Sequence, residues 1–224
     1  MTAIVADIRN KLNGSVFSKN RYGAYVRTKV TPINPRSAAQ VAQRSSFSAN
    51  AQAWRGLTEA QRLSWAAAAP NFPVTDIFGN PKILSPSALY SKLNGNLATI
   101  GVAAIASAPA LIAVPSATDL STSADNSTGV VNIGFEPDPV PANFKLVVRC
   151  TGNIGTGQSF VKNKFRIIAV LPAATASPAL ISTGFADKFG VPVTGQKIFV
   201  EAYLVSMISG QAGIASQVSA IVVA

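Results

Sequence analysis

The side chains that most often carry enzymatic chemistry are scarce in this sequence. It has no histidine and a single cysteine, Cys150, which excludes a histidine-dependent triad, a Cys/His zinc site and a disulfide within the chain. Cys150 ends the apolar run FKLVVRC, so we expect it to pack at a strand end and not to act as a nucleophile. The nine acidic residues are scattered, and Glu136 and Asp138 flank prolines in a turn, which disfavours a glycosidase-like pair. We therefore expect neither an enzyme nor a bound cofactor or metal.

Basic side chains gather instead near the N-terminus. Residues 19–40, KNRYGAYVRTKVTPINPRSAAQ, contain five Lys and Arg and no acidic residue. Residues 15–30 are predicted to form one or two short strands. Alternation within residues 24–30 predicts a ribbon with a small apolar face and an aromatic, basic face, the latter formed by Tyr25, Arg27 and Lys29. Two prolines follow, and the residues before them are held in an extended conformation. The sequence therefore predicts an extended, basic arm ahead of a helix.

Three roles remain open for this arm. It could anchor into a neighbouring subunit by adding to a sheet edge, which is the role we favour. It could contact nucleic acid, with tyrosines stacking on bases and cations neutralising phosphates. It could also be solvated, with its tyrosines packed on the protein's own helices. Arg44 and Arg62 each follow a Gln. Their guanidinium groups could donate hydrogen bonds to a carboxylate or a backbone carbonyl, or they could lie on solvated helix faces. The candidate assembly residues are Arg21, Tyr22, Tyr25, Arg27, Lys29, Pro32, Asn34, Pro35, Arg36, Arg44 and Arg62.

The charge is unevenly distributed along the 224 residues. Residues 1–101 hold twelve Lys and Arg and three acidic residues, whereas residues 102–224 hold seven and six. A basic half can attract phosphates, an anionic lipid surface or an acidic protein. Charged residues make up only 12% of the chain and hydrophobic residues 48%, which argues against disorder and suits a surface covered by partners. A monomer with an uncharged polar surface has the same composition.

One segment imitates a membrane span. Residues 97–117 carry no charge and are long enough to cross a bilayer. They are mostly Ala, Gly and Ser, however, and Pro109 and Pro115 would interrupt a helix. We expect the end of a helix followed by an extended, buried linker, and no membrane partner.

The region before this segment shows helical signals. Ser37 and Ser85 are expected N-caps, and Thr58 with Gln61 has the form of a capping box. Apolar residues at spacings of three and four predict a buried stripe on the last helix, made of Leu89, Tyr90, Leu93, Leu97 and Ile100. Trp54 and Trp65 are expected in the core of a helical hairpin.

After the segment, short β runs separated by turn residues predict an antiparallel β-sandwich. The expected strands are residues 129–135, 144–150, 160–171, 196–208 and 217–223. The whole chain is therefore predicted to be α+β, with an arm (1–36), a helical region (37–101), an apolar linker (102–116) and a sandwich (117–224).

The C-terminal half resembles a fibronectin type III or immunoglobulin-like module. The resemblance rests on a proline-led first strand at residues 114–117, the alternation VVNIGF and the final strand SQVSAIVVA. The tryptophan and cysteine pair of true immunoglobulin domains are absent. The resemblance implies binding or assembly and no chemistry.

Residues 23–69 are similar to structural proteins of tailed bacteriophages and prophages, in which an arm of the form YVR…P.NPRT..Q..QR precedes a segment like W..LT..QR..W. Ser37 stands where Thr is expected. The resemblance implies a virion component without catalytic residues. The matching residues are Tyr25, Val26, Arg27, Pro32, Asn34, Pro35, Arg36, Gln40, Gln43, Arg44, Trp54, Leu57, Thr58, Gln61, Arg62 and Trp65.

The expectation is a structural subunit of a bacteriophage virion, associated with the capsid or the tail. It would form a homo-oligomer and contact other virion proteins through its arm and its low-charge faces. The alternative is a nucleic-acid-binding protein packaged with the phage genome.

Overall fold

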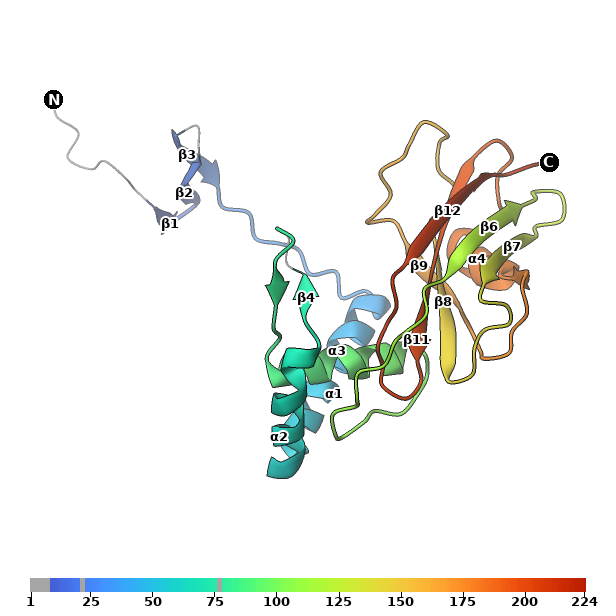
Figure 1. Ribbon diagram of the computed structural model, residues 1–224. Coiled ribbons are helices and arrows are strands. Elements are labelled where there is room, and N and C mark those ends of the chain that lie inside the picture. The colour runs from blue at the N-terminus through green and yellow to red at the C-terminus, as the bar shows by residue number, and fades with distance from the viewer. Residues whose placement is uncertain (1–8, 21–22, 76–77) are drawn as a thin grey trace. The chain divides into compact units, whose positions relative to one another are not determined.

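The computed structural model describes residues 9–20, 23–75 and 78–224. The chain divides into two compact units, Met1–Gln43 and Arg44–Ala224, and the division falls inside the first helix. The described residues combine helices with several antiparallel sheets, so the protein has the predicted α+β class (Figure 1).

The first unit contains a three-stranded antiparallel sheet in the order β1-β2-β3. Its strands are β1 (Asn10–Leu12), β2 (Ser15–Asn20) and β3 (Gly23–Thr28). The second and third strands were predicted, but the first was not. It forms because Asn13 and Gly14 make a two-residue turn, with Asn13 in the left-handed region at φ 52° and Leu12 paired to Ser15.

Three helices follow the arm sheet in the sequence, and their predicted N-caps are confirmed. The N–H groups of Gln40, Gln61 and Ala88 donate to the hydroxyls of Ser37, Thr58 and Ser85 over 3.4, 3.3 and 3.3 Å. The short ribbon and the 3₁₀ turn η1 lie between the second and third helices. The elements are α1 (Ala38–Gly56), α2 (Glu59–Ala68), η1 (Ala69–Asn71), β4 (Val74–Thr75), β5 (Pro81–Lys82) and α3 (Pro86–Thr99).

An aromatic core joins these helices, as predicted for both tryptophans. The ring of Tyr90 on α3 lies 5.4 Å from that of Trp54 on α1 and 5.3 Å from that of Trp65 on α2, measured between centroids. Trp65 is completely buried, and its indole N–H donates to the carbonyl of Ala106 over 2.8 Å. The predicted stripe on α3 is buried along its whole length.

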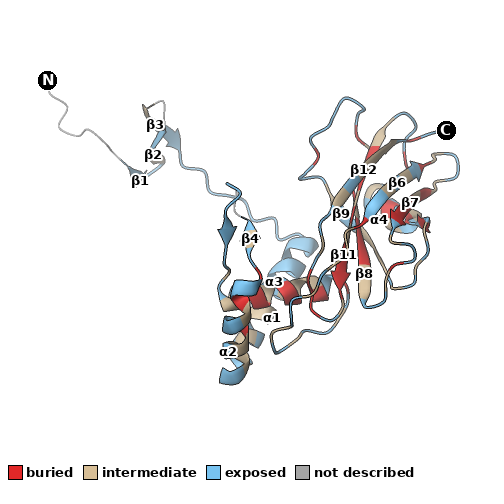
Figure 2. Ribbon diagram, viewed as in Figure 1, coloured by how far each residue is buried: buried red, intermediate tan, exposed pale blue. Residues whose placement is uncertain are grey.

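The C-terminal part is an antiparallel β-sandwich, as predicted. A sheet in the order β10-β7-β6 faces a sheet in the order β12-β11-β8-β9, and apolar side chains of both fill the core (Figure 2). The strands are β6 (Thr118–Ala124), β7 (Val131–Glu136), β8 (Phe144–Cys150), β9 (Arg166–Leu171), β10 (Ala179–Leu180), β11 (Lys197–Ser206) and β12 (Ser216–Ile221).

Parts of the sandwich differ from the expectation. The predicted first strand at residues 114–117 is irregular, and β6 begins immediately after it. β9 is shorter than predicted because residues 160–165 belong to its connection with β8. The helix α4 (Ser182–Phe189) was not predicted, and it packs so closely on β9 that a Cβ at Gly184 would collide with the carbonyl oxygen of Ile168.

The linker after α3 is clamped by two buried amide side chains. Asn94 donates to the carbonyl of Ile105 and accepts from its N–H, over 3.2 and 2.8 Å. Gln211 donates to the carbonyl of Ala110 and accepts from the N–H of Ile112. Residues 102–116 therefore run extended without helix or strand, but they are half-buried or exposed and not fully buried as predicted. No helix among the described residues is long and apolar enough to cross a membrane.

Candidate assembly surface

The arm sheet has two chemically different faces, as the alternation predicted. Residues paired across antiparallel strands point to the same side of a sheet. Phe17 pairs with Val26, and Leu12 lies on the same side as both, with Lys19 at the far end of that side. We call Leu12, Phe17 and Val26 the apolar face. Lys11 and Arg27 both pair with Val16 on the opposite side, which also holds Tyr25; we call Lys11, Tyr25 and Arg27 the basic face.

Both faces are open to solvent within this unit. Leu12 is 69% exposed and Val26 58% exposed, and no described residue of 9–43 is buried (Figure 2). The outer edges of β1 and β3 have no neighbouring strand among the described residues. A small sheet without a core is marginally stable by itself, and unpaired strand edges readily pair with another chain. The arm thus has the features of a surface that is completed by a partner.

The segment between β3 and α1 extends this exposed surface. Lys29 fixes its start, because the Lys29 N–H donates to the carbonyl of Gly14 over 2.8 Å. Arg36 has φ 48°, an unusual left-handed conformation that lies immediately before the cap Ser37. Pro32, Asn34 and Pro35 lie between these two points in exposed, extended chain.

The predicted assembly residues are therefore only partly gathered. Tyr25 and Arg27 share the basic face with Lys11, which sequence reasoning missed because β1 was not predicted. Arg21 and Tyr22 lie outside the described residues. Arg44 is exposed on α1.

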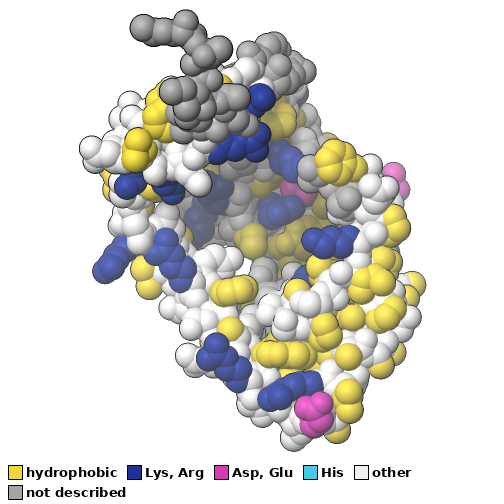
Figure 3. Space-filling view, turned by 90° about the vertical axis from the view of Figure 1, so that its left-hand side faces the viewer, with side chains coloured by type: hydrophobic (Ala, Val, Ile, Leu, Met, Phe, Trp, Pro, Cys, Tyr) yellow, Lys and Arg dark blue, Asp and Glu magenta, His cyan; other side chains and the backbone are white. Residues whose placement is uncertain are grey.

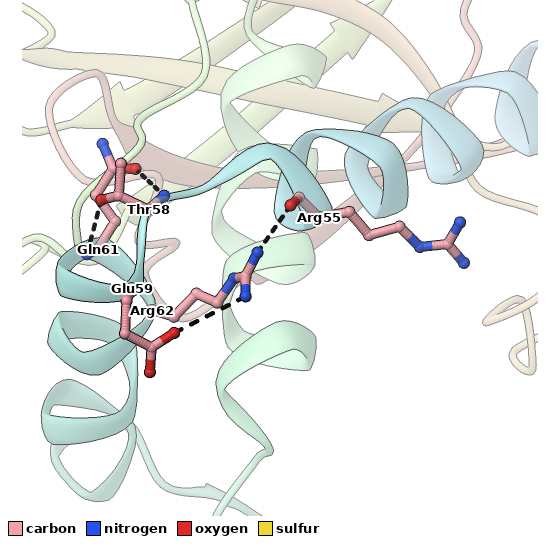
Figure 4. A network of polar contacts seen from close by, with 5 residues as sticks. All are labelled: Arg55, Thr58, Glu59, Gln61 and Arg62. Atoms are coloured by element: carbon pink, nitrogen blue, oxygen red, sulfur yellow. Dashed lines mark hydrogen bonds and ion pairs between the residues drawn. The ribbon is translucent and has the colours of Figure 1, made fainter.

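Arg62 makes contacts within its own chain, one of the two alternatives predicted for it. Its Nη2 donates to the carbonyl of Arg55 at the end of α1 over 2.8 Å, and its Nη1 lies 3.9 Å from the carboxylate of Glu59 (Figure 4). The capping box of Thr58 and Gln61 lies beside these contacts. Arg62 thus ties the start of α2 to the end of α1.

An apolar groove runs between α1 and α3. Its volume is about 730 Å³, and Phe47, which is 69% exposed, and Trp54 contribute to its lining. Arg55 and Lys92 supply cations to the lining. Figure 3 shows hydrophobic side chains interspersed with Lys and Arg over one side of the molecule, with few acidic side chains among them. Sequence reasoning did not predict this groove, because the two helices that form it are brought together only by the fold.

The shifted pKa values of Cys150 and Asp125 have local structural causes. Cys150 is completely buried, and burial raises the pKa of its thiol to about 12, which confirms the predicted packing role. The pKa of Asp125 is lowered, chiefly by the hydrogen bond from the Ser127 hydroxyl and then by the backbone of Thr128, in a turn between β6 and β7. The described residues contain no group of three or more Cys, Asp or Glu side chains placed to hold a metal ion.

Comparison with known proteins identifies no family for the chain. No family model matches, and no curated protein matches. Among solved structures, a fibronectin type III-like protein from Clostridium thermocellum is similar to half of this chain and to 93% of its own length, with 20% sequence identity and a TM-score of 0.31. The strand order of the sandwich, and not this weak similarity, establishes the fold class.

Proposed function

We propose that this protein is a structural subunit that assembles through its N-terminal arm, and that the assembly is a bacteriophage virion. The observation that carries the proposal is a three-stranded sheet with an open apolar face, a basic face and no core of its own. The virion assignment is supported by the resemblance of residues 23–69 to phage structural proteins.

The energetics favour covering the apolar face. Ordering the backbone of one residue costs about 1–2 kcal/mol, so a sheet of this size needs apolar burial to be stable. Burying one Val or Leu side chain contributes about 1.5–3 kcal/mol, and Leu12, Phe17 and Val26 are available for this on one face. A partner surface would supply the core that the arm lacks.

The occupant is a second copy of the chain, and charge indicates which part of it. Residues 1–101 are strongly basic, so two arms would repel each other. Residues 102–224 carry six of the nine acidic residues and almost no net charge. The arm of one copy therefore binds the sandwich of the next, a head-to-tail contact that generates rings or filaments.

A nucleic-acid-binding role is the second candidate, and the basic face favours it. Lys11 and Arg27 lie on one side of the sheet with the half-exposed ring of Tyr25, an arrangement suited to phosphates and stacked bases. Such binding weakens steeply with salt because each neutralised phosphate releases counterions.

Single substitutions on the two faces test the proposal. Val26→Ser removes apolar area from one face, and Arg27→Ser removes a cation from the other. Leu63→Ser is the control, because Leu63 on α2 is 60% exposed, close to the 58% of Val26, and belongs to neither the arm nor the sandwich. Light scattering measures the mass of each purified full-length variant, and fluorescence anisotropy measures binding of a labelled single-stranded DNA.

Assembly predicts a defined oligomer for the natural chain and for Leu63→Ser. The Val26→Ser oligomer should dissociate into monomers at a concentration about tenfold higher than the natural oligomer does. Arg27→Ser should weaken assembly only at low salt. The nucleic-acid role is favoured instead if all variants are monomers and DNA binding falls with Arg27→Ser. Monomers of every variant without DNA binding would contradict both roles.

A further inference from the structure

A row of polar side chains crosses the outward face of the four-stranded sheet of the sandwich. In the strand register, Gln217 on β12 lies opposite Glu201 on β11, and Glu201 lies opposite Arg149 on β8. Alternate residues of these strands point into the sandwich core, so the three polar side chains point outward.

Apolar clusters cover this face on both sides of the polar row. At one side, the end of α3 and the linker pack on Val147 and Val205. At the other side, the connection between β8 and β9 folds over Phe199. The row is left open between these covers and forms part of a groove of about 430 Å³.

The guanidinium of Arg149 is held in one orientation. Its Nη2 donates to Oε1 of Glu201 over 2.6 Å, and its central carbon lies 5.1 Å from the centroid of the Tyr203 ring. The Glu201 side chain is only 15% exposed, so the ion pair is largely desolvated, and this desolvation offsets much of its Coulomb attraction. Nε of Arg149 is shielded from solvent and has no acceptor in the protein. The carboxylate of Glu201 and the ring of Tyr203 therefore orient the guanidinium of Arg149 at the edge of the groove.

The remaining walls of the groove add an aromatic ring and further polar groups. Phe160 is 74% exposed, and it lines the groove with Ser159 and Lys162. A guanidinium only donates hydrogen bonds, a carboxylate only accepts them, and the amide of Gln217 does both. Each sugar hydroxyl also donates and accepts, while the C–H face of a sugar ring packs on an aromatic ring. Since cations and a carboxylate lie side by side, the groove suits a ligand with hydroxyls better than a strongly charged one.

We propose that this groove is a saccharide-binding site, with Arg149, Glu201 and Gln217 bonding the hydroxyls and Phe160 packing on the ring. The groove is built from residues of the second unit alone, so the proposal does not rest on assembly through the arm. Few contacts are available to a single sugar, so binding of a monosaccharide is expected in the millimolar range.

Saturation-transfer NMR on the full chain tests the site, because this method also works for large assemblies. The probes are the methyl glycosides of glucose, galactose, N-acetylglucosamine and glucuronic acid, with acetate as an anion without hydroxyls. Phe160→Ala should weaken binding about tenfold, as loss of an aromatic contact does. Arg149→Lys keeps the charge but loses the planar fork, and should weaken it similarly. Phe47→Ala removes an equally exposed ring elsewhere and should leave binding unchanged.

Binding of at least one glycoside that both groove variants weaken, and that the control does not, supports the proposal. Failure of all four glycosides to bind overturns it. So does binding that is unchanged in Phe160→Ala and Arg149→Lys, because the sugar then lies elsewhere. Binding of acetate as tight as that of the glycosides would indicate a simple anion site and would also overturn it.

Discussion

Removing the amide of Asn94 should loosen the linker that joins the helical region to the sandwich. Asn94 lies on α3, is 1% exposed, and makes both of its hydrogen bonds to the backbone of Ile105. Asn94→Ala leaves the N–H and the carbonyl of Ile105 without these partners. The N–H and carbonyl at this position are half-buried, so solvent can replace the lost bonds only in part.

The size of the effect follows from the number of bonds. A neutral hydrogen bond contributes about 0.5–1.5 kcal/mol net, so loss of two should lower the free energy of unfolding by about 1–3 kcal/mol. Asn94→Asp should destabilise further at neutral pH, because it places a carboxylate against the carbonyl of Ile105 and buries its charge. Burial raises the pKa of this new carboxyl in the folded state. Its protonated form is therefore favoured by folding, so the deficit relative to the natural chain should shrink as the pH falls.

Urea unfolding followed by tryptophan fluorescence measures these differences, since Trp65 donates to the neighbouring carbonyl of Ala106. Thr99→Ala is the control, because Thr99 is exposed on the same helix and its hydroxyl donates only to the carbonyl of Gly95, one turn earlier. Its effect should stay within about 0.5 kcal/mol. The reasoning is refuted if Asn94→Ala matches this control, or if the Asn94→Asp deficit grows as the pH falls.

Three other perturbations probe the second unit. Cys150 should not react with a thiol-specific chromogenic reagent at pH 8 until guanidinium unfolds the chain. A pKa of about 12 leaves only about one thiol in ten thousand ionised at that pH. Rapid reaction of the native protein would contradict this. Gly184→Ala should lower the free energy of unfolding by about 1–3 kcal/mol in thermal melts, because the new Cβ collides with β9. Gly157→Ala is the control, since a Cβ there meets open space and should leave stability unchanged. Equal effects of the two variants would exclude the collision as the cause. Thr58→Ala should cost about 1 kcal/mol through loss of the capping box, and an unchanged melting temperature would show that the cap is dispensable.

The parts of the fold that local patterns determine could be predicted from the sequence. The stripe on α3 has a helical period and is buried as predicted; its contact with the tryptophans through Tyr90 was not predicted. The Asn13-Gly14 turn also carried a local signal, but it was overlooked, and β1 was missed with it. The helix α4 was missed because it is only eight residues long and is stabilised by packing on β9 more than by a periodic pattern.

The candidate sites depend on distant contacts, which single-sequence patterns do not contain. The polar row requires the register between Arg149 and Glu201, which are 52 residues apart. The clamp by Gln211 joins positions 101 residues apart in the chain. By contrast, the two faces of the arm follow from alternation within one strand, and Tyr25 and Arg27 were placed correctly for that reason.

The central claim is that the arm of one copy binds a second copy, and the mass of the chain with and without its arm tests this most directly. Every buried side chain of the described residues lies beyond residue 37, so a chain of residues 37–224 keeps both cores. Light scattering at matched concentrations should give a defined oligomer for the full chain and a monomer for the shortened one. The same number of chains per particle for both, whether one or several, would contradict assembly through the arm.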